Sequence, residues 1–332
     1  MSFVVTIAKL QEAFTPGLTG YAKTLEQAIS TGEAYDRSIA QDTQALERGR
    51  QVIAKAPGDL GKSDELLDAA RPALLFFDRF LPLYNKWTYS ALSLQEEVYA
   101  KFDRFRGIDF ARFRADSESL RSVRQELVGA DAVLRKAHDG LSTQWRGKAA
   151  DGATEHIDRY LTVTDEVNRR FTTISAHTDN LTNGLVRDIQ RLATEVIALH
   201  SADCGGYTPH QVDEMINFVR GETGMPLANA FSKVLSWTGD TSADVVKELP
   251  NVGSAAAAGV IKVLNAIRKS FEERLNERFA KNFTEKLKTF QDTLCKGREA
   301  AIREMWDGFR GATAKFTDHP FEKVPLLPPR GK

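Results

Sequence analysis

The sequence predicts an all-α protein, built as an elongated bundle of long antiparallel helices around a central helical hairpin. Three observations support this prediction. Runs of β-branched residues with the period of two that is typical of strands are absent. Proline is scarce, with 11 residues in 332, so long segments contain no helix breaker. Leucine and other apolar residues recur at seven-residue steps in the middle of the chain, which is typical of paired helices.

The first region, residues 1–110, is expected to hold two helical stretches. One runs from about Gly20 to Lys55 and stops at Pro57-Gly58, because proline and glycine both break helices. The other begins at Ser63, which we expect to be an N-cap. Asp64-Glu65 follows in the first turn, where the helix dipole favours negative charge.

A very apolar segment lies inside the second of these stretches. It runs from Ala73 to Tyr84 and is the most apolar part of the N-terminal third of the chain. Proline inside a helix removes a hydrogen bond and clashes with the preceding turn. We therefore expect Pro72 and Pro82 to interrupt the stretch, which extends to about Asp103.

The second region, residues 111–203, is predicted to be a long helical hairpin with its turn at Trp145-Arg146-Gly147. Both helices carry apolar residues at the two seam positions of a heptad, and antiparallel helices joined by so short a turn bury a shared seam. Trp145 should lie at one tip, with Leu120 and Leu199 near the other end. The seam series of the first helix are Leu120, Leu127, Leu134 and Leu141, and Val123, Ala130 and Ala137. Those of the second helix, from about Lys148 to His200, are Ala150, Ile157, Thr164, Phe171, Thr178, Leu185, Leu192 and Leu199, and Ala153, Tyr160, Val167, Ile174 and Leu181.

Two further regions complete the expected organisation. Residues 204–315 form a C-terminal helical region, with a shorter helix at about 208–236 and a long one from about Ala255 to Phe309. Residues 316–332 hold four prolines, and we expect them to be an extended tail.

Composition and charge exclude several classes of function. Lysine and arginine number 45, as do aspartate and glutamate, so the formal net charge is zero and argues against a nucleic-acid binder. Two cysteines leave no material for a disulfide framework. The N-terminal residues lack the basic and apolar segments of a cleaved signal peptide. No stretch reaches the ~18 apolar residues of a membrane span, so contact with a membrane is unsupported by any spanning segment.

Three of the four tryptophans stand in Trp-x-Gly triplets. Only the triplet at Trp145 lies between two heptad-patterned helices, where Gly147 can take the left-handed conformation of a tight turn. We interpret the other two, at Trp237 and Trp306, as helix ends. On spacing alone, Trp145 can also be a residue that simply packs over the end of the hairpin.

The segment from Leu127 to Tyr160 resembles the hairpin centre of the WXG family, the small helical substrates of type VII (ESX) secretion. The shared features are the leucine and alanine heptads before the tryptophan, the glycine turn, and an alanine-rich start of the second helix. Over residues 113–200, the resemblance implies a hairpin that pairs with another hairpin. It also implies synthesis in the cytoplasm and export without a cleaved signal peptide. Trp145 and Gly147 would then be the interaction motif, and the partner a helical hairpin, a chaperone or the secretion ATPase.

Substrates of this family also carry a Tyr-x-x-x-Asp/Glu export signal, and Tyr99 and Asp103 match it. Such a match is also expected by chance, so both interpretations stay open. A helix from about Phe110 to Gln144 would be about 50 Å long. The short linker before it cannot return the chain over that length, because an extended residue spans at most ~3.6 Å. We therefore do not expect Tyr99 beside Trp145.

Signals for catalysis are weak, and we expect neither an enzyme nor a bound cofactor. Residues 56–63 meet a relaxed phosphate-loop pattern, but a helix precedes them, so a turn between helices is the better interpretation. His200, Cys204 and His210 gather in a junction between two helices. These side-chain types can hold Zn²⁺, but their spacing matches no zinc motif, so we assign no metal and leave the question to the structure.

Two functions from different classes fit these features. The first is a non-enzymatic secreted helical protein, a substrate or effector-like partner of a bacterial type VII secretion system that acts through helix–helix interaction. The alternative is a membrane-active helical toxin of the pore-forming type, which would rearrange to insert the apolar segments 73–84 and 255–267. Neither segment is long enough to span a bilayer. Secretion that depends on the secretion ATPase favours the first function, and dye release from liposomes favours the second.

Overall fold

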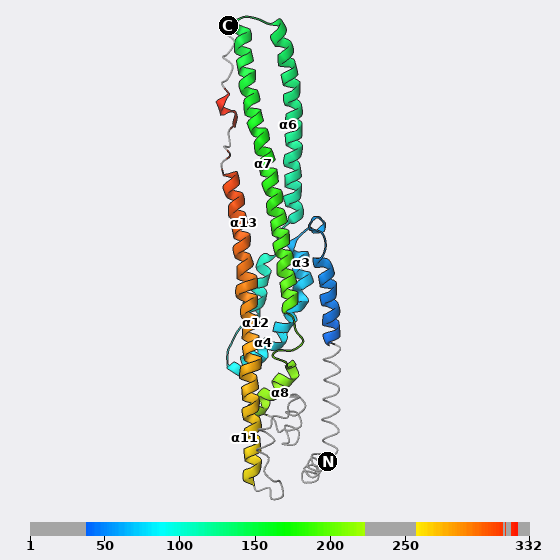
Figure 1. Cartoon of the computed structure of the whole chain (residues 1–332), viewed down its shortest axis with the longest axis vertical. Coiled ribbons are helices and arrows are strands. Elements are labelled where there is room, and N and C mark those ends of the chain that lie inside the picture. Colours follow the sequence, from blue (N-terminus) through cyan, green and yellow to red (C-terminus); the bar gives the residue numbers. More distant parts are fainter. Residues whose placement is uncertain (1–37, 223–256, 315, 317–319, 325–332) are drawn as a thin grey trace. The chain divides into compact units, whose positions relative to one another are not determined.

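The computed structural model describes residues 38–222, 257–314, 316 and 320–324. Within these ranges the secondary structure is helical, without strands, and has two isolated β-bridges, Lys62 with Asp109 and Cys204 with Tyr207 (Figure 1). The predicted all-α class is confirmed. The helix start expected near Gly20, the Trp237 triplet and most of the tail lie outside the described residues.

The chain divides into two compact units, each of which combines segments that are distant in the sequence. Unit 1 comprises Met1–Arg50, Ala70–Phe102 and Glu195–Leu294. Unit 2 comprises Gln51–Ala69, Asp103–Thr194 and Cys295–Lys332. The expected N-terminal region and the expected C-terminal helical region each contribute to both units.

Unit 1 contains an aromatic core in which α4, Leu75–Thr88, packs against the C-terminal helices. Ring centroids lie 5.2 Å apart for Phe77 and Phe290 and 4.7 Å apart for Tyr84 and Phe283. Rings of this size bury large apolar areas and dominate the energy of a core. The phenylalanines that are at most 1% exposed are Phe76, Phe77, Phe80, Phe102, Phe110, Phe279, Phe283 and Phe290, of which Phe110 belongs to unit 2.

The two prolines of the apolar segment affect the helices differently. Pro72 lies in a 3-10 helix, η2 (Arg71–Leu74), which separates α3 (Ser63–Ala70) from α4. Pro82 lies inside α4, which continues to Thr88, so the interruption expected at Pro82 is wrong. Phe76 and Tyr84, on either side of this proline, both stack on Phe283. Packing against one partner ring holds the two halves of α4 in line.

The remaining helices of unit 1 include α8 (Pro209–Arg220), which begins with a capping box formed by Thr208 and Gln211. Short elements follow α4 at η3 (Gln95–Tyr99) and α5 (Ala100–Phe102). A further helical run consists of α11 (Ala257–Arg274), η5 (Leu275–Ala280), α12 (Lys281–Lys288), η6 (Thr289–Lys296) and α13 (Gly297–Thr313), the last of which belongs to unit 2.

The long helix expected from about Ala255 to Phe309 is confirmed over its described part by this run. Trp306 lies inside α13, four residues or more from either end of the helix, so its interpretation as a helix end is wrong. Its ring contacts Phe113, with centroids 5.7 Å apart, and Phe309 at 6.1 Å. The indole is thus part of the packing, and Gly308 does not end the helix.

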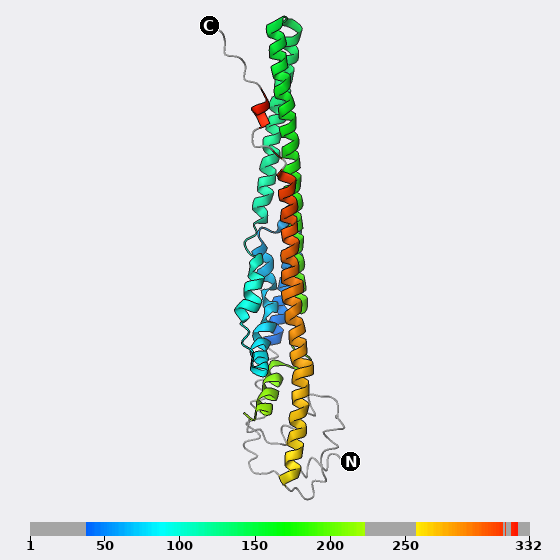
Figure 2. The ribbon, with the colours of Figure 1, turned by 90° about the vertical axis from the view of Figure 1, so that its left-hand side faces the viewer.

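Unit 2 is built around the hairpin of α6 (Phe110–Gln144) and α7 (Lys148–Leu199), of which residues 195–199 belong to unit 1. The hydroxyl of Ser117 donates to the carbonyl of Ser175 at 3.1 Å, and Arg135 pairs with Asp165 at 2.9 Å. Residue numbers rise along one helix as they fall along the other, so the helices are antiparallel, as Figure 2 also shows. The predicted hairpin and its three-residue turn are confirmed. Because α7 has 52 residues and α6 has 35, α7 continues past the start of α6, so the expectation that Leu120 and Leu199 both lie near the same end of the pair is wrong.

The positions predicted for the seam of α7 are all buried or half-buried, but the α7 side chains that bond to α6, such as Asn168 and Asp165, belong to neither predicted series. Of the seven seam positions predicted for α6, four are exposed and therefore wrong. Leu120, Leu127 and Leu134 are half-buried, as a seam requires. Leu141, the last leucine of the first series, is 52% exposed, and the second series, Val123, Ala130 and Ala137, is exposed as well.

Polar residues take the inner position that this series was expected to fill. Ser117 is fully buried, Asp131 is 6% exposed, and the side chain of His138 is 13% exposed. After Leu127 and Leu134, the inner position lies four residues further on, at Asp131 and His138, whereas the prediction placed it three residues further on. Asn168 donates to Asp131 and the carbonyl of Ser175 accepts from Ser117, whereas Nε2 of His138 is buried without a hydrogen-bond partner.

A third helix of unit 2, α13, packs along α7 in the antiparallel direction. Arg298 pairs with Asp188 at 3.1 Å. Met305 lies so close to Gly184 that a Cβ added there would be 2.6 Å from its sulfur, so a side chain at 184 would require the thioether of Met305 to move. After α13, the tail forms a 3-10 helix, η7 (Pro320–Lys323), where the sequence predicted extended chain.

Candidate functional site

The free end of the hairpin is the turn Trp145-Arg146-Gly147 between α6 and α7. Trp145 is the C-cap of α6, and its backbone N–H donates to the carbonyl of Leu141 at 2.8 Å. Gly147 has a φ of 107°, which residues with a side chain rarely adopt. Its carbonyl accepts a hydrogen bond from the N–H of Asp151 at 3.0 Å, in the first turn of α7. The turn itself therefore requires glycine at 147, as expected.

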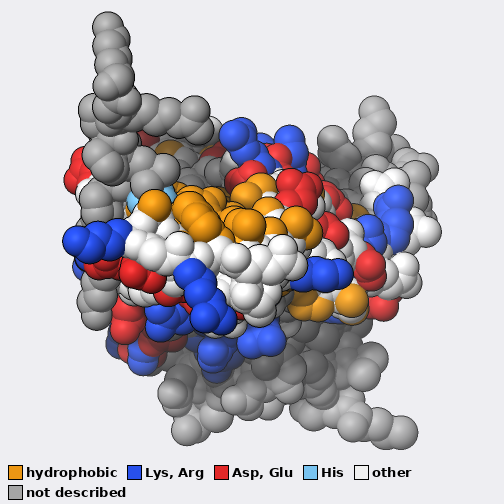
Figure 3. All heavy atoms as spheres, turned by 90° about the horizontal axis from the view of Figure 1, so that it is seen from above, with side chains coloured by type: hydrophobic (Ala, Val, Ile, Leu, Met, Phe, Trp, Pro, Cys, Tyr) orange, Lys and Arg blue, Asp and Glu red, His pale blue; other side chains and the backbone are white. Residues whose placement is uncertain are grey.

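Apolar side chains are exposed at this end of the hairpin. Trp145 is 46% exposed, and Leu141, one helical turn before it, is 52% exposed. Seen from above, hydrophobic side chains gather in the middle of the described surface, with charged side chains around them (Figure 3). About half of the indole is thus open to a partner, which a purely structural role in packing would not require.

α6 carries more exposed apolar side chains along its length. Val123, Val128 and Val133 are 49%, 44% and 71% exposed. With Leu141 and Trp145 they make up five of the seven large exposed hydrophobic residues in the described part of the chain. Val123 belongs to the heptad series that was expected in the seam. The three valines are five residues apart, so they point to different sides of α6 and do not form one stripe.

The described contacts of Tyr99 lie within unit 1. The hydroxyl of Tyr99 donates to both carboxylate oxygens of Asp78, at 2.8 and 2.9 Å, and the guanidinium of Arg71 lies over its ring at 4.9 Å. Asp103, the other half of the Tyr-x-x-x-Asp match, precedes α6, whose 35 residues span about 50 Å before Trp145. Tyr99, four residues before Asp103, cannot cross that length, as the linker argument predicted.

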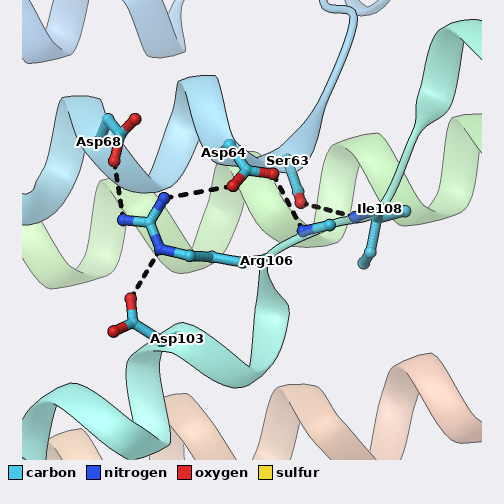
Figure 4. A network of polar contacts seen from close by, with 7 residues as sticks. Ser63, Asp64, Asp68, Asp103, Arg106 and Ile108 are labelled. Atoms are coloured by element: carbon cyan, nitrogen blue, oxygen red, sulfur yellow. Dashed lines mark hydrogen bonds and ion pairs between the residues drawn. The ribbon is translucent and has the colours of Figure 1, made fainter.

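Asp103 belongs instead to a polar network at the root of the hairpin (Figure 4). Its carboxylate accepts a hydrogen bond from Nε of Arg106 at 2.7 Å, and the same guanidinium reaches Asp68 at 2.7 Å and Asp64 at 3.4 Å. The N–H of Gly107 donates to Asp64 at 2.9 Å. This bond, aided by Arg106, holds the pKa of Asp64 below its ordinary value, against a smaller opposing effect of burial.

Sequence reasoning missed this network and gave Ser63 a different role. The expected N-cap hydroxyl of Ser63 accepts from the N–H of Ile108 at 3.1 Å, and the N–H of Ser63 donates to the carbonyl of Ile108 at 3.0 Å. Glu65 accepts from the N–H groups of Gly61 and Lys62, at 2.8 and 3.1 Å, and so satisfies the start of α3. The acidic first turn of α3 was visible in the sequence, but its partner, Arg106, was not.

His200, Cys204 and His210 are each engaged elsewhere. Nδ1 of His200 lies 3.2 Å from the carbonyl of Ala73, and His210 pairs with Glu214 at 3.4 Å. Cys204 is fully buried, and burial raises the pKa of its thiol to about 12. A metal needs the thiolate, so this environment opposes binding. Within the described ranges, no three histidine, cysteine or acidic side chains come together as metal ligands.

The described surface also has a shallow hollow of about 400 Å³ on the outside of α7, near its start. Polar residues of this one helix line it, and two of them, Arg159 and Glu155, pair with each other. The hollow therefore offers no buried nucleophile or base. The residues that line it are Asp151, Thr154, Glu155, Asp158, Arg159 and Thr162.

Comparisons of the chain with protein-family models, with curated proteins and with solved structures found no match. None of the helices that the structure describes combines the length and the apolar character that crossing a bilayer takes.

Proposed function

We propose that this protein is a non-enzymatic substrate or effector-like partner of a bacterial type VII (ESX) secretion system, which it engages through the free end of its helical hairpin. The observation that carries the proposal is the position of Trp145. It stands at the end of a two-helix turn, half exposed, beside a glycine that the turn requires. This arrangement agrees with the resemblance of residues 113–200 to the WXG family.

The chemistry of the hairpin end suits binding to a protein. A large aromatic side chain that is partly accessible at a rigid turn can fill a pocket and contribute much of the binding energy. Leu141, exposed one turn before it, extends the apolar surface. The partner is a helical hairpin protein, a chaperone or the secretion ATPase.

The exposed series on α6 provides a second surface for the same partner. Val123, Ala130 and Ala137 have heptad spacing but are exposed. A partner helix that packs on them would bury an apolar stripe of the kind that paired helices share. Recognition then involves the end and the outer surface of α6, and it does not use Tyr99, whose hydroxyl is bound to Asp78.

The proposal is tested by secretion of Trp145→Ala from a bacterium with an active type VII system. We expect a large loss of secreted protein with little loss of helix content, because a residue at a turn has few neighbours and leaves a small cavity. Immunoblots of cell and supernatant fractions measure export, and circular dichroism measures folding. Secretion of Trp145→Ala at the level of the unchanged protein would count against the proposal.

Trp306→Ala is the matched control. Trp306 stands in the same kind of triplet, but inside α13, where its ring packs on Phe113. We expect this variant to be less stable than the unchanged protein. The fraction of it that folds should still be secreted. If the unchanged protein instead released dye from liposomes and its secretion did not depend on the secretion ATPase, the membrane-active alternative would take first place.

A further inference from the structure

The last described residues form a short turn on the hairpin. The N–H of Val324 donates to the carbonyl of Phe321 at 3.0 Å, next to the end of η7. The ring of Phe321 stacks on Tyr160 of α7, with centroids 5.6 Å apart, and the side chain stays 41% exposed. The turn therefore sets the point at the surface of unit 2 from which the chain continues.

A proline-rich segment begins at the end of this turn. Residues 324–330 read Val-Pro-Leu-Leu-Pro-Pro-Arg, and Pro325 and Pro328 are the only prolines of the sequence that stand three residues apart. Proline locks its own φ at about −65° and moves the residue before it out of the helical region. This explains why η7 ends at Lys323, because Val324 precedes a proline. For residues 325–330, which lie outside the described ranges, the prolines favour polyproline II.

The geometry of polyproline II converts this spacing into a pattern of ridges. The helix has about three residues per turn and rises about 3.1 Å per residue, so residues three apart lie on the same ridge. The pairs Val324-Pro325 and Leu327-Pro328 thus repeat one apolar shape at an interval of about 9 Å. Arg330 follows one turn later, on the ridge that Val324 and Leu327 share.

We propose that residues 324–330 are a ligand for an aromatic-lined groove of the SH3 type in a partner protein. Proline-rich segments dock into such grooves as polyproline II helices, and the two apolar pairs match two neighbouring pockets. Because the prolines already restrict the free segment, little conformational entropy is lost when it binds. The inference goes beyond the proposed function and does not rest on it, since it involves neither Trp145 nor export.

The charge of the segment sets the direction and register of binding. From Lys323 to Lys332 the sequence holds three basic residues and no acidic one. The ridges repeat at every turn, so the apolar pairs alone allow more than one register. A guanidinium pairs well with carboxylates, and Arg330 stands at one end of the pattern. The groove therefore carries an acidic pocket beyond its two apolar pockets, and this pocket selects one register.

Binding of the full chain to a panel of purified, fluorescently labelled SH3 domains tests the inference by fluorescence polarisation. We expect saturable binding to domains with an acidic pocket, and an excess of an unlabelled proline-rich peptide should displace the chain. Pro328→Ala should weaken binding at least about tenfold. Pro329→Ala is the matched control, because this neighbouring proline lies on the ridge that points away from the groove. It should weaken binding less than about threefold.

A second pair of variants tests the role of charge. Arg330→Glu should weaken binding about tenfold or more, and binding of the unchanged protein should weaken as the salt concentration rises. Lys332→Glu makes the same change of charge two residues further on, where the ridge points away from the groove. It should bind nearly as well as the unchanged protein. Circular dichroism confirms that all variants keep their helix content.

Three outcomes would overturn the inference. The first is the absence of saturable binding to every domain of the panel. The second is an equal loss of binding in Pro328→Ala and Pro329→Ala, because the ridges would then not matter. The third is binding by a synthetic peptide of residues 320–332 but not by the full chain, because the segment would then be covered in the protein. None of these measurements involves export, so the inference and the proposed function fail independently.

Discussion

Asn168 of α7 donates a hydrogen bond through Nδ2 to Oδ2 of Asp131 of α6, at 3.2 Å, inside the seam of the hairpin. Asp131 is 6% exposed, so its carboxylate is removed from water beside the half-buried Leu127 and Leu134 of the same helix. A buried polar pair of this kind contributes little net stability, but it allows only one register, because any shift leaves both groups unpaired. The pair therefore fixes which α6 positions face α7.

The first prediction concerns this pair. Asp131→Ala should lower the free energy of unfolding by about 1–3 kcal/mol, because it leaves the amide of Asn168 without its acceptor. Asp131→Leu/Asn168→Leu should restore the stability of the unchanged protein or exceed it, because both polar groups leave the seam together. Urea denaturation followed by circular dichroism measures both effects, with exposed Asp116→Ala as the control. A double variant that is less stable than Asp131→Ala would contradict this account.

The same pair shows where prediction from sequence succeeds and where it stops. The turn at Trp145 and both hairpin helices follow from leucine spacing, glycine and the absence of proline, which are all local signals. The choice between Ala130 and Asp131 as the inner position is not local. It depends on Asn168, a partner 37 residues from Asp131 that no heptad count identifies.

In the candidate site, too, the features that depend on local sequence could be predicted and those that depend on distant partners could not. Gly147 could be predicted because a tight turn between helices needs a residue with positive φ. The exposure of Val123 could not be predicted, because it depends on the register of α6 against α7. The bond of Tyr99 to Asp78 joins residues 21 positions apart. Arg106, the neighbour of Asp103, reaches Asp64 and Asp68, which precede it by 42 and 38 positions. The motif pattern alone contained none of these partners.

The second prediction concerns acid. The pKa of Asp64 is lower in the folded protein than the ordinary value of about 3.9, chiefly because the N–H of Gly107 donates to its carboxylate. A carboxylate with a lowered folded pKa contributes stability above its unfolded pKa, and this contribution is lost as pH falls through the folded pKa. Asp64→Asn should therefore be less sensitive to pH below about 4 than the unchanged protein. Urea midpoints across this range measure the slope, and Asp59→Asn, at an exposed position, is the control. Equal slopes for Asp64→Asn and the unchanged protein would contradict the prediction.

The third prediction concerns the thiol of Cys204. Burial raises its pKa to about 12, and only the thiolate is nucleophilic, so Cys204 should resist thiol reagents at mildly alkaline pH in the folded protein. It should react rapidly in urea. Because its pKa is higher in the folded state than in the unfolded state, stability should fall as pH rises above about 8.5. Cys204→Ala should lack this contribution. Mass spectrometry of alkylated protein over time measures the reactivity, and rapid labelling of Cys204 without denaturant would refute the prediction.

The last prediction separates the two interpretations of Tyr99. Tyr99→Phe keeps the ring beneath Arg71 but removes the hydroxyl that donates to Asp78. The carboxylate of Asp78 then loses this donor, which should lower the free energy of unfolding by about 1–2 kcal/mol. Export should stay close to that of the unchanged protein, because the hydroxyl of Tyr99 stabilises the fold and is not recognised by a partner. Thermal denaturation and the same secretion assay as for Trp145→Ala measure the two effects. A variant that keeps its stability but is no longer secreted would identify residues 99–103 as an export signal.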